Sequence, residues 1–139
     1  MQTKEQKTQT QAMESVSKAL PSLMRSSKVQ QKAAKVGFDW SNAEDALAKL
    51  YEECDELKEA VSKGDTDNQY EELGDVLFSV VNVARLLKID SEHALYDARD
   101  KFIGRFSKVE ALAKERGIDM KSATLSELDS LWDEVKIKE

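Results

Sequence analysis

The chain contains few of the residues that interrupt regular structure or bind transition metals. It has one cysteine, one histidine, one proline and five glycines among 139 residues. Cys54 alone cannot form an intramolecular disulfide, and His93 alone excludes a histidine-rich metal site or a di-iron bundle built on two Glu-x-x-His units. The scarcity of proline and glycine disfavours an all-β fold, because such a fold of this size needs many turn residues.

The sequence also lacks a long apolar run and an excess of positive charge. No stretch approaches the roughly 20 consecutive apolar residues that span a membrane, and the first residues do not lead into the apolar core of a signal peptide. We therefore expect a cytoplasmic protein without a membrane partner. The net charge of −6 disfavours nucleic acid as the main partner, because contacts to a phosphate backbone require clustered lysines and arginines.

What the chain does contain is helical periodicity. Apolar residues recur at intervals of three and four residues in five segments, which predicts an all-α bundle of about five helices. Three capping signatures support it: Ser41-x-x-Glu44, Thr66-x-x-Gln69 and Thr124-x-x-Glu127. The predicted helices cover about residues 21–36, 41–63, 66–88, 91–116 and 124–137. We expect residues 1–19 to be a flexible segment and residues 20–139 to form one domain.

Three of these helices carry apolar stripes that we expect to face the core. The stripes consist of Leu50, Cys54, Leu57 and Val61 on the second helix, Leu73, Leu77, Val80 and Ala84 on the third, and Phe102, Phe106, Val109 and Ala113 on the fourth. The second and third helices are expected to form an antiparallel hairpin around Gly64.

Acidic side chains border two of these stripes. Glu53 and Glu56 lie beside the stripe of the second helix, while Glu72 and Asp75 share one flank of the third. Facing carboxylates about 5 Å apart would repel by roughly 3 kcal/mol per pair at an effective dielectric near 20. A bound cation relieves this repulsion, and ligands with oxygen alone suit Mg²⁺ or Mn²⁺. The alternative is a set of solvated helix faces, because 27 acidic residues produce such pairs by chance.

Basic and aromatic side chains recur near the C-terminal end. Lys101 and Arg105 are four residues apart on the fourth helix, and Trp132 and Lys136 have the same spacing on the last. An arginine grips phosphate oxygens with two hydrogen bonds, a lysine supplies a point charge, and a tryptophan can stack on a base. The alternatives are an ordinary charged helix surface and a tryptophan that belongs to the core.

Several of these motifs, in this order, resemble the MazG family of all-α nucleoside triphosphate pyrophosphohydrolases. The resemblance covers about residues 20–137 and is most like the C-terminal catalytic domain of the two-domain MazG proteins. The motifs that carry it are residues 32–40 (KAAKVGFDW), Glu53-x-x-Glu56 followed by Glu72-x-x-Asp75, residues 71–85 (EELGDVLFSVVNVAR), Lys101-Phe102 with Arg105-Phe106, and Trp132 with Lys136.

The resemblance implies Mg²⁺-dependent hydrolysis of nucleoside triphosphates, ribo and deoxyribo, to a monophosphate and pyrophosphate. Water would attack the α-phosphorus, and the cellular role would be to limit abnormal or excess nucleotides. The implied metal ligands are Glu53, Glu56, Glu72 and Asp75, and Mn²⁺ is an expected substitute. Glu53 and Glu56 are the implied catalytic residues, with Glu56 as the candidate general base.

The resemblance also implies the substrate contacts and the assembly. The expected substrate-binding residues are Lys101, Arg105, Trp132, Lys136, Asn82 and Lys35. Phe38, Trp40 and Trp132 are available to stack on the base. Helix hairpins that pair across subunits would give a homodimer, with a tetramer as the larger alternative.

Two other functions fit the same residues. The first is a non-catalytic helical interaction module whose acidic side chains only solvate its surface. The second is a related helical phosphohydrolase that acts on another nucleotide, such as dUTP or a phosphoribosyl-nucleotide.

Overall fold

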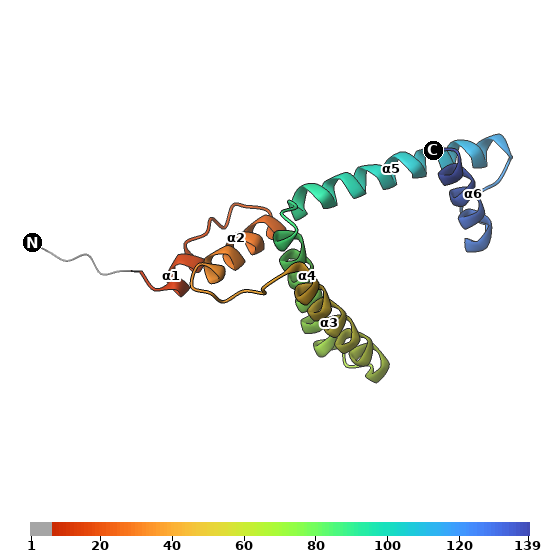
Figure 1. Cartoon of the computed structure of the whole chain (residues 1–139). Helices are drawn as coiled ribbons and strands as arrows, with labels where there is room; N and C mark the ends of the chain where they lie inside the picture. The colour runs from red at the N-terminus through yellow and green to blue at the C-terminus, as the bar shows by residue number, and fades with distance from the viewer. Residues whose placement is uncertain (1–6) are drawn as a thin grey trace, which may run out of the picture. The chain divides into compact units, whose positions relative to one another are not determined.

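The computed structural model describes residues 7–139, and every regular element in this range is a helix. The helices are α1 (Gln9–Glu14), α2 (Ser22–Ala34), α3 (Ala43–Lys63), α4 (Thr66–Leu86), α5 (Ser91–Glu115) and α6 (Leu125–Ile137) (Figure 1). The predicted all-α class is confirmed, with six helices in the described range instead of five. None of them is long and apolar enough to cross a membrane. The described residues form two compact units, one up to Glu92 and one from His93 onward.

The first helix lies in the segment that we expected to be flexible. Residues 1–6 of that segment lie outside the described residues, but residues 9–14 form α1. Its N-terminus carries a reciprocal capping box, in which the side chains of Thr8 and Gln11 each bond the other's backbone N–H. The sequence-based expectation did not include this helix, because it relied on apolar periodicity and overlooked the cap, and the flexibility of the segment stays a prediction. The expectation of one domain over residues 20–139 stays a prediction.

Two predicted helix starts are displaced by one residue. The N-cap of α3 is Asn42, whose side chain accepts a hydrogen bond from the backbone N–H of Asp45 at 2.8 Å, in place of Ser41. Asp65 caps α4 in the same way, in place of Thr66. Asparagine and aspartate are at least as favourable at this position as serine and threonine, so the neighbouring residue takes the role.

Helices α3 and α4 form the expected hairpin and lie side by side (Figure 1). Gly64 ends α3 in the left-handed conformation, with φ of 65°, which glycine adopts without a steric penalty. The buried line of α3 contains Ala46, Glu53 and Ala60, each seven residues from the next. Two alanines on this line allow the α4 backbone to approach closely. Val81 is the largest fully buried side chain.

Several residues of the predicted core stripes of this hairpin face outward in the single chain. Val61 is 60% exposed, Leu73 50% and Leu77 51%, and Cys54 is also exposed. The prediction that these residues form the core of the chain was wrong. Periodicity identifies an apolar face of a helix but not the surface that covers it, and here the alanine line faces the neighbouring helix instead.

The second unit has its own small core at the end of α5 and on α6. Its buried residues are Val109, Ala113, Leu131 and Val135. The predicted Thr124 cap of α6 is confirmed, because its hydroxyl accepts from the backbone N–H of Glu127 at 3.1 Å. Phe102 and Phe106, which we expected in the core, are 56% and 40% exposed.

Candidate active site

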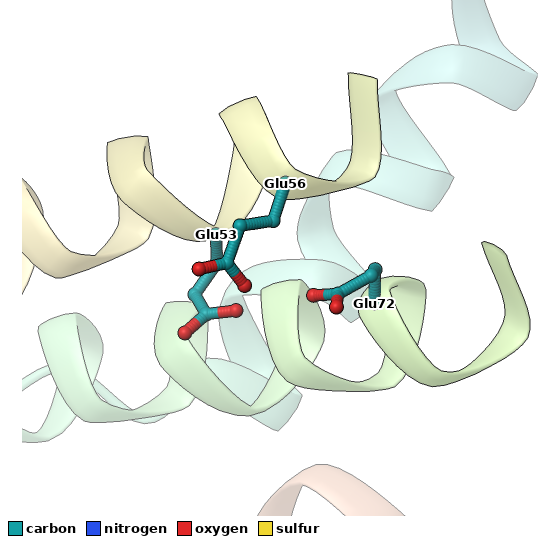
Figure 2. Close-up of side chains that lie close together, drawn as sticks. All are labelled: Glu53, Glu56 and Glu72. Carbon is teal, nitrogen blue, oxygen red and sulfur yellow. The ribbon is translucent and has the colours of Figure 1, made fainter. Parts of the chain in front are cut away.

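The α3/α4 hairpin brings three acidic side chains together. Glu53 and Glu56 extend from α3 toward α4, and Glu72 extends from α4 toward them (Figure 2). Each contributes one carboxylate oxygen to a group whose members lie within 4.8 Å of one another. Residues three apart lie on the same side of a helix, so Glu53 and Glu56 present their carboxylates together. Three of the four predicted ligands therefore form one carboxylate cluster.

Two oxygens of this cluster lack a partner. Oε2 of Glu53 and Oε2 of Glu72 are buried, and neither has a hydrogen-bond partner within residues 7–139. Burial raises the pKa of the Glu72 carboxyl, and a hydrogen bond with Glu56 and the negative charges nearby raise it further. A buried carboxylate without a partner is costly unless a cation neutralises it. The three residues thus fit a hard divalent cation such as Mg²⁺, which binds through oxygen.

The fourth predicted ligand lies at the edge of the cluster. Asp75 is one turn beyond Glu72 on α4 and is exposed, and its oxygens are not part of the group within 4.8 Å. Its charge is nevertheless close enough to contribute to the raised pKa of Glu72. Its role as a metal ligand stays a prediction.

A lysine that sequence reasoning overlooked completes one side of the cluster. Nζ of Lys49 lies 3.0 Å from Oε1 of Glu53 and 3.6 Å from Oε1 of Glu52. The hydrogen bond with Glu53 is the largest cause of the raised pKa of Lys49. The i,i+4 spacing of Lys49 and Glu53 was a visible signal for this pair. Lys49 therefore balances one oxygen of Glu53 and leaves the other without a partner.

The same unit contains a pocket of about 490 Å³ between the N-terminal helices and α4. Its walls are mostly apolar and aromatic, with a few polar side chains among them. They are formed by Met13, Val29, Gln30, Ala33, Gly37, Phe38, Asp39, Trp40, Phe78, Asn82 and Arg85. A concave, largely apolar pocket with a few polar groups is typical of a small-molecule site. We call it the aromatic pocket.

A network of charged and polar side chains closes one wall of the aromatic pocket. The guanidinium of Arg85 donates to both carboxylate oxygens of Asp39 and, at 2.9 Å, to Oδ1 of Asn82. The hydrogen bond from Arg85 lowers the pKa of Asp39, and a further hydrogen bond from the backbone N–H of Trp40 also lowers it. Sequence reasoning found Asn82 but did not assign Asp39 or Arg85 to a site, because nothing in their spacing of 46 residues signals the pair.

The aromatic pocket is aligned along α4 with Asp75, the predicted ligand at the edge of the carboxylate cluster. Asn82 follows Asp75 by seven residues, which is nearly two complete turns of a helix. The two side chains therefore share one face of α4, about 10 Å apart along its axis. One ligand of moderate length could contact both places.

The predicted phosphate and base contacts of the last two helices lie in the second unit. Arg105 is bound by Glu139, with Nε to Oε2 at 2.9 Å and Nη2 to Oε2 at 2.8 Å. The Trp132 ring lies 5.3 Å from the Phe102 ring, and the Arg105 guanidinium carbon lies 5.9 Å from the Trp132 ring centroid. Lys101 and Lys136 are exposed. The predicted roles of these side chains in substrate binding stay predictions.

Lys35 is the remaining predicted substrate contact. It forms the C-cap of α2, two residues before Gly37, and it is exposed. It does not line the aromatic pocket. Its contact with substrate also stays a prediction.

Comparison with known proteins identifies a family model that matches part of the chain. Residues 41–110 match the family model described as the MazG nucleotide pyrophosphohydrolase domain. This range contains all three residues of the carboxylate cluster, together with Asp75, Asn82 and Arg85.

Similar sequences occur in several bacteria. The chain is 39% identical over 136 residues, 96% of its length, to the nucleoside triphosphate pyrophosphohydrolase of Escherichia coli K12. It is 39% identical over 117 residues, 84% of its length, to the nucleoside triphosphate pyrophosphohydrolase/pyrophosphatase MazG of Thermotoga maritima. It spans 52% and 45% of these two proteins, about half the length of each. Because the family model matches half of its residues, the chain belongs to the MazG family.

Proposed function

We propose that this chain hydrolyses nucleoside triphosphates to a monophosphate and pyrophosphate, with Mg²⁺ held by Glu53, Glu56 and Glu72. The observation that carries the proposal is the carboxylate cluster, in which two buried oxygens lack a hydrogen-bond partner among residues 7–139. The names of the relatives in E. coli and T. maritima support the reaction. Mn²⁺ is an expected substitute, because the ligands offer oxygen alone.

The proposed metal ligands have different chemical roles. A bound Mg²⁺ supplies charge stabilisation to phosphate oxygens and lowers the pKa of a bound water. Glu53 is buried and paired with Lys49, so its orientation is fixed and it serves as a ligand. Glu56 is exposed, so it can exchange a proton with solvent and is our candidate general base. Asp75, one turn from Glu72, is the proposed fourth ligand.

The substrate's base is assigned to the aromatic pocket. Phe38 is 80% exposed and Trp40 is 39% exposed, so both rings can contact a ligand. Stacking on such rings discriminates little among bases, because every base has a π-face. The spacing of about 10 Å along α4 between Asn82 and Asp75, the proposed fourth metal ligand, leaves room for a sugar and an α-phosphate. Asn82, at the pocket wall, is suited to contact the sugar.

Cationic side chains are needed for the pyrophosphate that leaves. Lys101 and Arg105 are the candidates on α5, and Lys136 and Lys35 are further candidates. Arg105 suits this role, because its guanidinium already binds a carboxylate and can exchange it for phosphate oxygens. Trp132 is a proposed contact of a different kind, because its ring can stack on the base.

The chain is proposed to act as a homodimer, with a tetramer as the larger alternative. On α4, the exposed apolar residues Tyr70, Leu73, Leu77, Val80 and Leu87 follow one another at intervals of three, four and seven residues. This is the spacing of a seam between packed helices. The outward stripe of α3 has the same spacing. Two hairpins that pair through these stripes would form a four-helix bundle and bury both.

The proposal is tested by separating the products formed from a panel of ribo- and deoxyribonucleoside triphosphates, with Mg²⁺ or with EDTA. Monophosphate and pyrophosphate that appear only with Mg²⁺ support it. Diphosphate and orthophosphate would contradict attack at the α-phosphorus. Turnover of dUTP alone would identify a specialised relative. No turnover by folded protein would favour the interaction module, and the proposed role in limiting abnormal or excess nucleotides would lose its basis.

A further inference from the structure

The aromatic pocket contains a hydrogen-bond acceptor that the protein does not use. Gln30 on α2 is 4% exposed, and its Nε2 donates to the backbone carbonyl of Phe78 at 2.9 Å. Because only the amide nitrogen can donate to a carbonyl, this bond determines which end of the side chain is the oxygen. That oxygen, Oε1, is buried and has no hydrogen-bond partner in the described part of the chain.

Such an acceptor is unusual and points to a ligand. Nearly all buried polar atoms in proteins have a partner, because an unpartnered one loses its hydrogen bonds to water without replacement. The neighbours of Gln30 in the pocket wall include Met13, Val29 and Ala33, whose side chains offer no N–H or O–H donor. Both terminal nitrogens of Arg85 already donate to Asp39 or Asn82. Nε of Arg85 is also buried without a partner, but no donor within residues 7–139 is bonded to Oε1 of Gln30, so a ligand in the pocket can supply one.

We propose that Oε1 of Gln30 accepts a hydrogen bond from the exocyclic amino group of the substrate's base. The inference rests on the proposed function and narrows it to nucleotides with an amino-bearing base, such as adenine or cytosine. An exocyclic amino group projects beyond the ring, so it is the part of a base that most readily approaches a side chain in the pocket wall. The ring N–H of uracil or thymine lies between two carbonyl oxygens of the base. The oxygens of the Gln30 side chain and of the Phe78 carbonyl would repel these base oxygens.

The test compares nucleotides that differ only in the amino group. ATP is paired with purine riboside triphosphate, and CTP with pyrimidin-2-one riboside triphosphate; neither analogue has an N–H on its base. We expect kcat/KM of the native chain with Mg²⁺ to be about tenfold higher for the amino-bearing member of at least one pair, since this matches one hydrogen bond to a buried acceptor. Equal values within both pairs would overturn the inference. This comparison needs no variant.

A substitution then assigns the preference to Gln30. Gln30→Met has a similar length but no acceptor, and it should lower the preference to about twofold or less while both members of the pair are still hydrolysed. Gln31→Met is the matched control, because Gln31 is exposed and outside the pocket, and it should keep the native preference. A preference that survives Gln30→Met in folded protein would contradict the assignment.

The outcomes separate this inference from the proposed function. Hydrolysis to monophosphate and pyrophosphate without a preference within either pair would contradict the inference alone. Absence of hydrolysis for all four nucleotides would contradict the proposed function, and the inference with it.

Discussion

The side-chain nitrogen of Lys49 lies 3.0 Å from Oε1 of Glu53, one turn further along α3. Oε2 of the same carboxylate is buried and unpartnered among residues 7–139. One oxygen of Glu53 is therefore balanced by the protein, and the other is available to a cation. Lys49 also fixes the orientation of Glu53, since the pair lies on a single helix and Glu53 is almost fully buried.

Replacing this lysine should destabilise the protein without metal. We expect Lys49→Met to lower the Tm in EDTA by about 3–6 °C, because Glu53 would lose its counter-charge beside two other carboxylates. The rise in Tm on adding Mg²⁺ should be larger than in the native chain, since the ion would then relieve more repulsion. Thermal unfolding with and without Mg²⁺ measures both effects. Lys58→Met, at an exposed position of α3, is the control, and equal behaviour of the two variants would contradict this account.

The pair of Asp39 and Arg85 predicts a stability effect that depends on pH. Because Arg85 lowers the pKa of Asp39 below its ordinary value of 3.8, the pair stabilises the fold above that pH. The stabilisation is lost as the pH falls through the lowered pKa. Asp39→Asn should therefore reduce the free energy of unfolding by about 1–2 kcal/mol at pH 7, and the difference from the native chain should shrink toward pH 2.

Denaturant unfolding of both proteins between pH 2 and pH 7 makes this comparison. Arg85→Gln should reproduce the effect of Asp39→Asn at pH 7, and the double variant should cost less than the two single effects added together. A difference between the native chain and Asp39→Asn that stays constant over the whole range would show that the charge of Asp39 does not stabilise the fold.

Much of this molecule could be predicted from periodicity and caps. The helical class, the α3/α4 hairpin and the Thr124 cap follow from local patterns, because helix formation depends mainly on residues within a few positions. The grouping of Glu53, Glu56 and Glu72 followed in turn from two i,i+3 spacings and one short turn. These predictions needed only distances along the chain.

The parts that could not be predicted depend on contacts between distant segments. Gln30 lies 48 residues from Phe78, and Asp39 lies 46 residues from Arg85, so no local spacing signals either pair. The prediction that Leu77 and its neighbours on the stripe are buried was wrong for a related reason. The spacing of apolar residues does not say whether the same chain or a second copy covers them.

A dimer formed through the outward stripes should be sensitive to charge at its centre. Leu77 is 51% exposed in one chain, so Leu77→Glu should not affect the folding of an isolated chain greatly. In a paired hairpin it would bury a carboxylate, which is strongly unfavourable. We expect sedimentation equilibrium to give at least twice the 15.7 kDa chain mass for the native protein and a single chain mass for Leu77→Glu. Leu125→Glu, at a residue 74% exposed on α6, is the control and should stay associated.

The contact between Arg105 and Glu139 predicts competition with substrate. If Arg105 binds the pyrophosphate portion, Glu139 must be displaced first, and Glu139→Gln should lower KM for a nucleoside triphosphate by about threefold. Arg105→Gln should raise KM instead. Steady-state kinetics on the two variants check this pair of opposite effects. Unchanged KM in both would place the pyrophosphate away from Arg105.

The carboxylate cluster is proposed to bind the metal that the reaction needs. The most direct test compares Glu53→Gln with Glu52→Gln, since these neighbouring substitutions remove the same charge. The Glu53 side chain is 9% exposed and belongs to the cluster, whereas that of Glu52 is 61% exposed. We expect Mg²⁺-dependent release of pyrophosphate to fall at least about 100-fold in Glu53→Gln and to change less than about twofold in Glu52→Gln. Similar rates in the two folded variants would contradict the account.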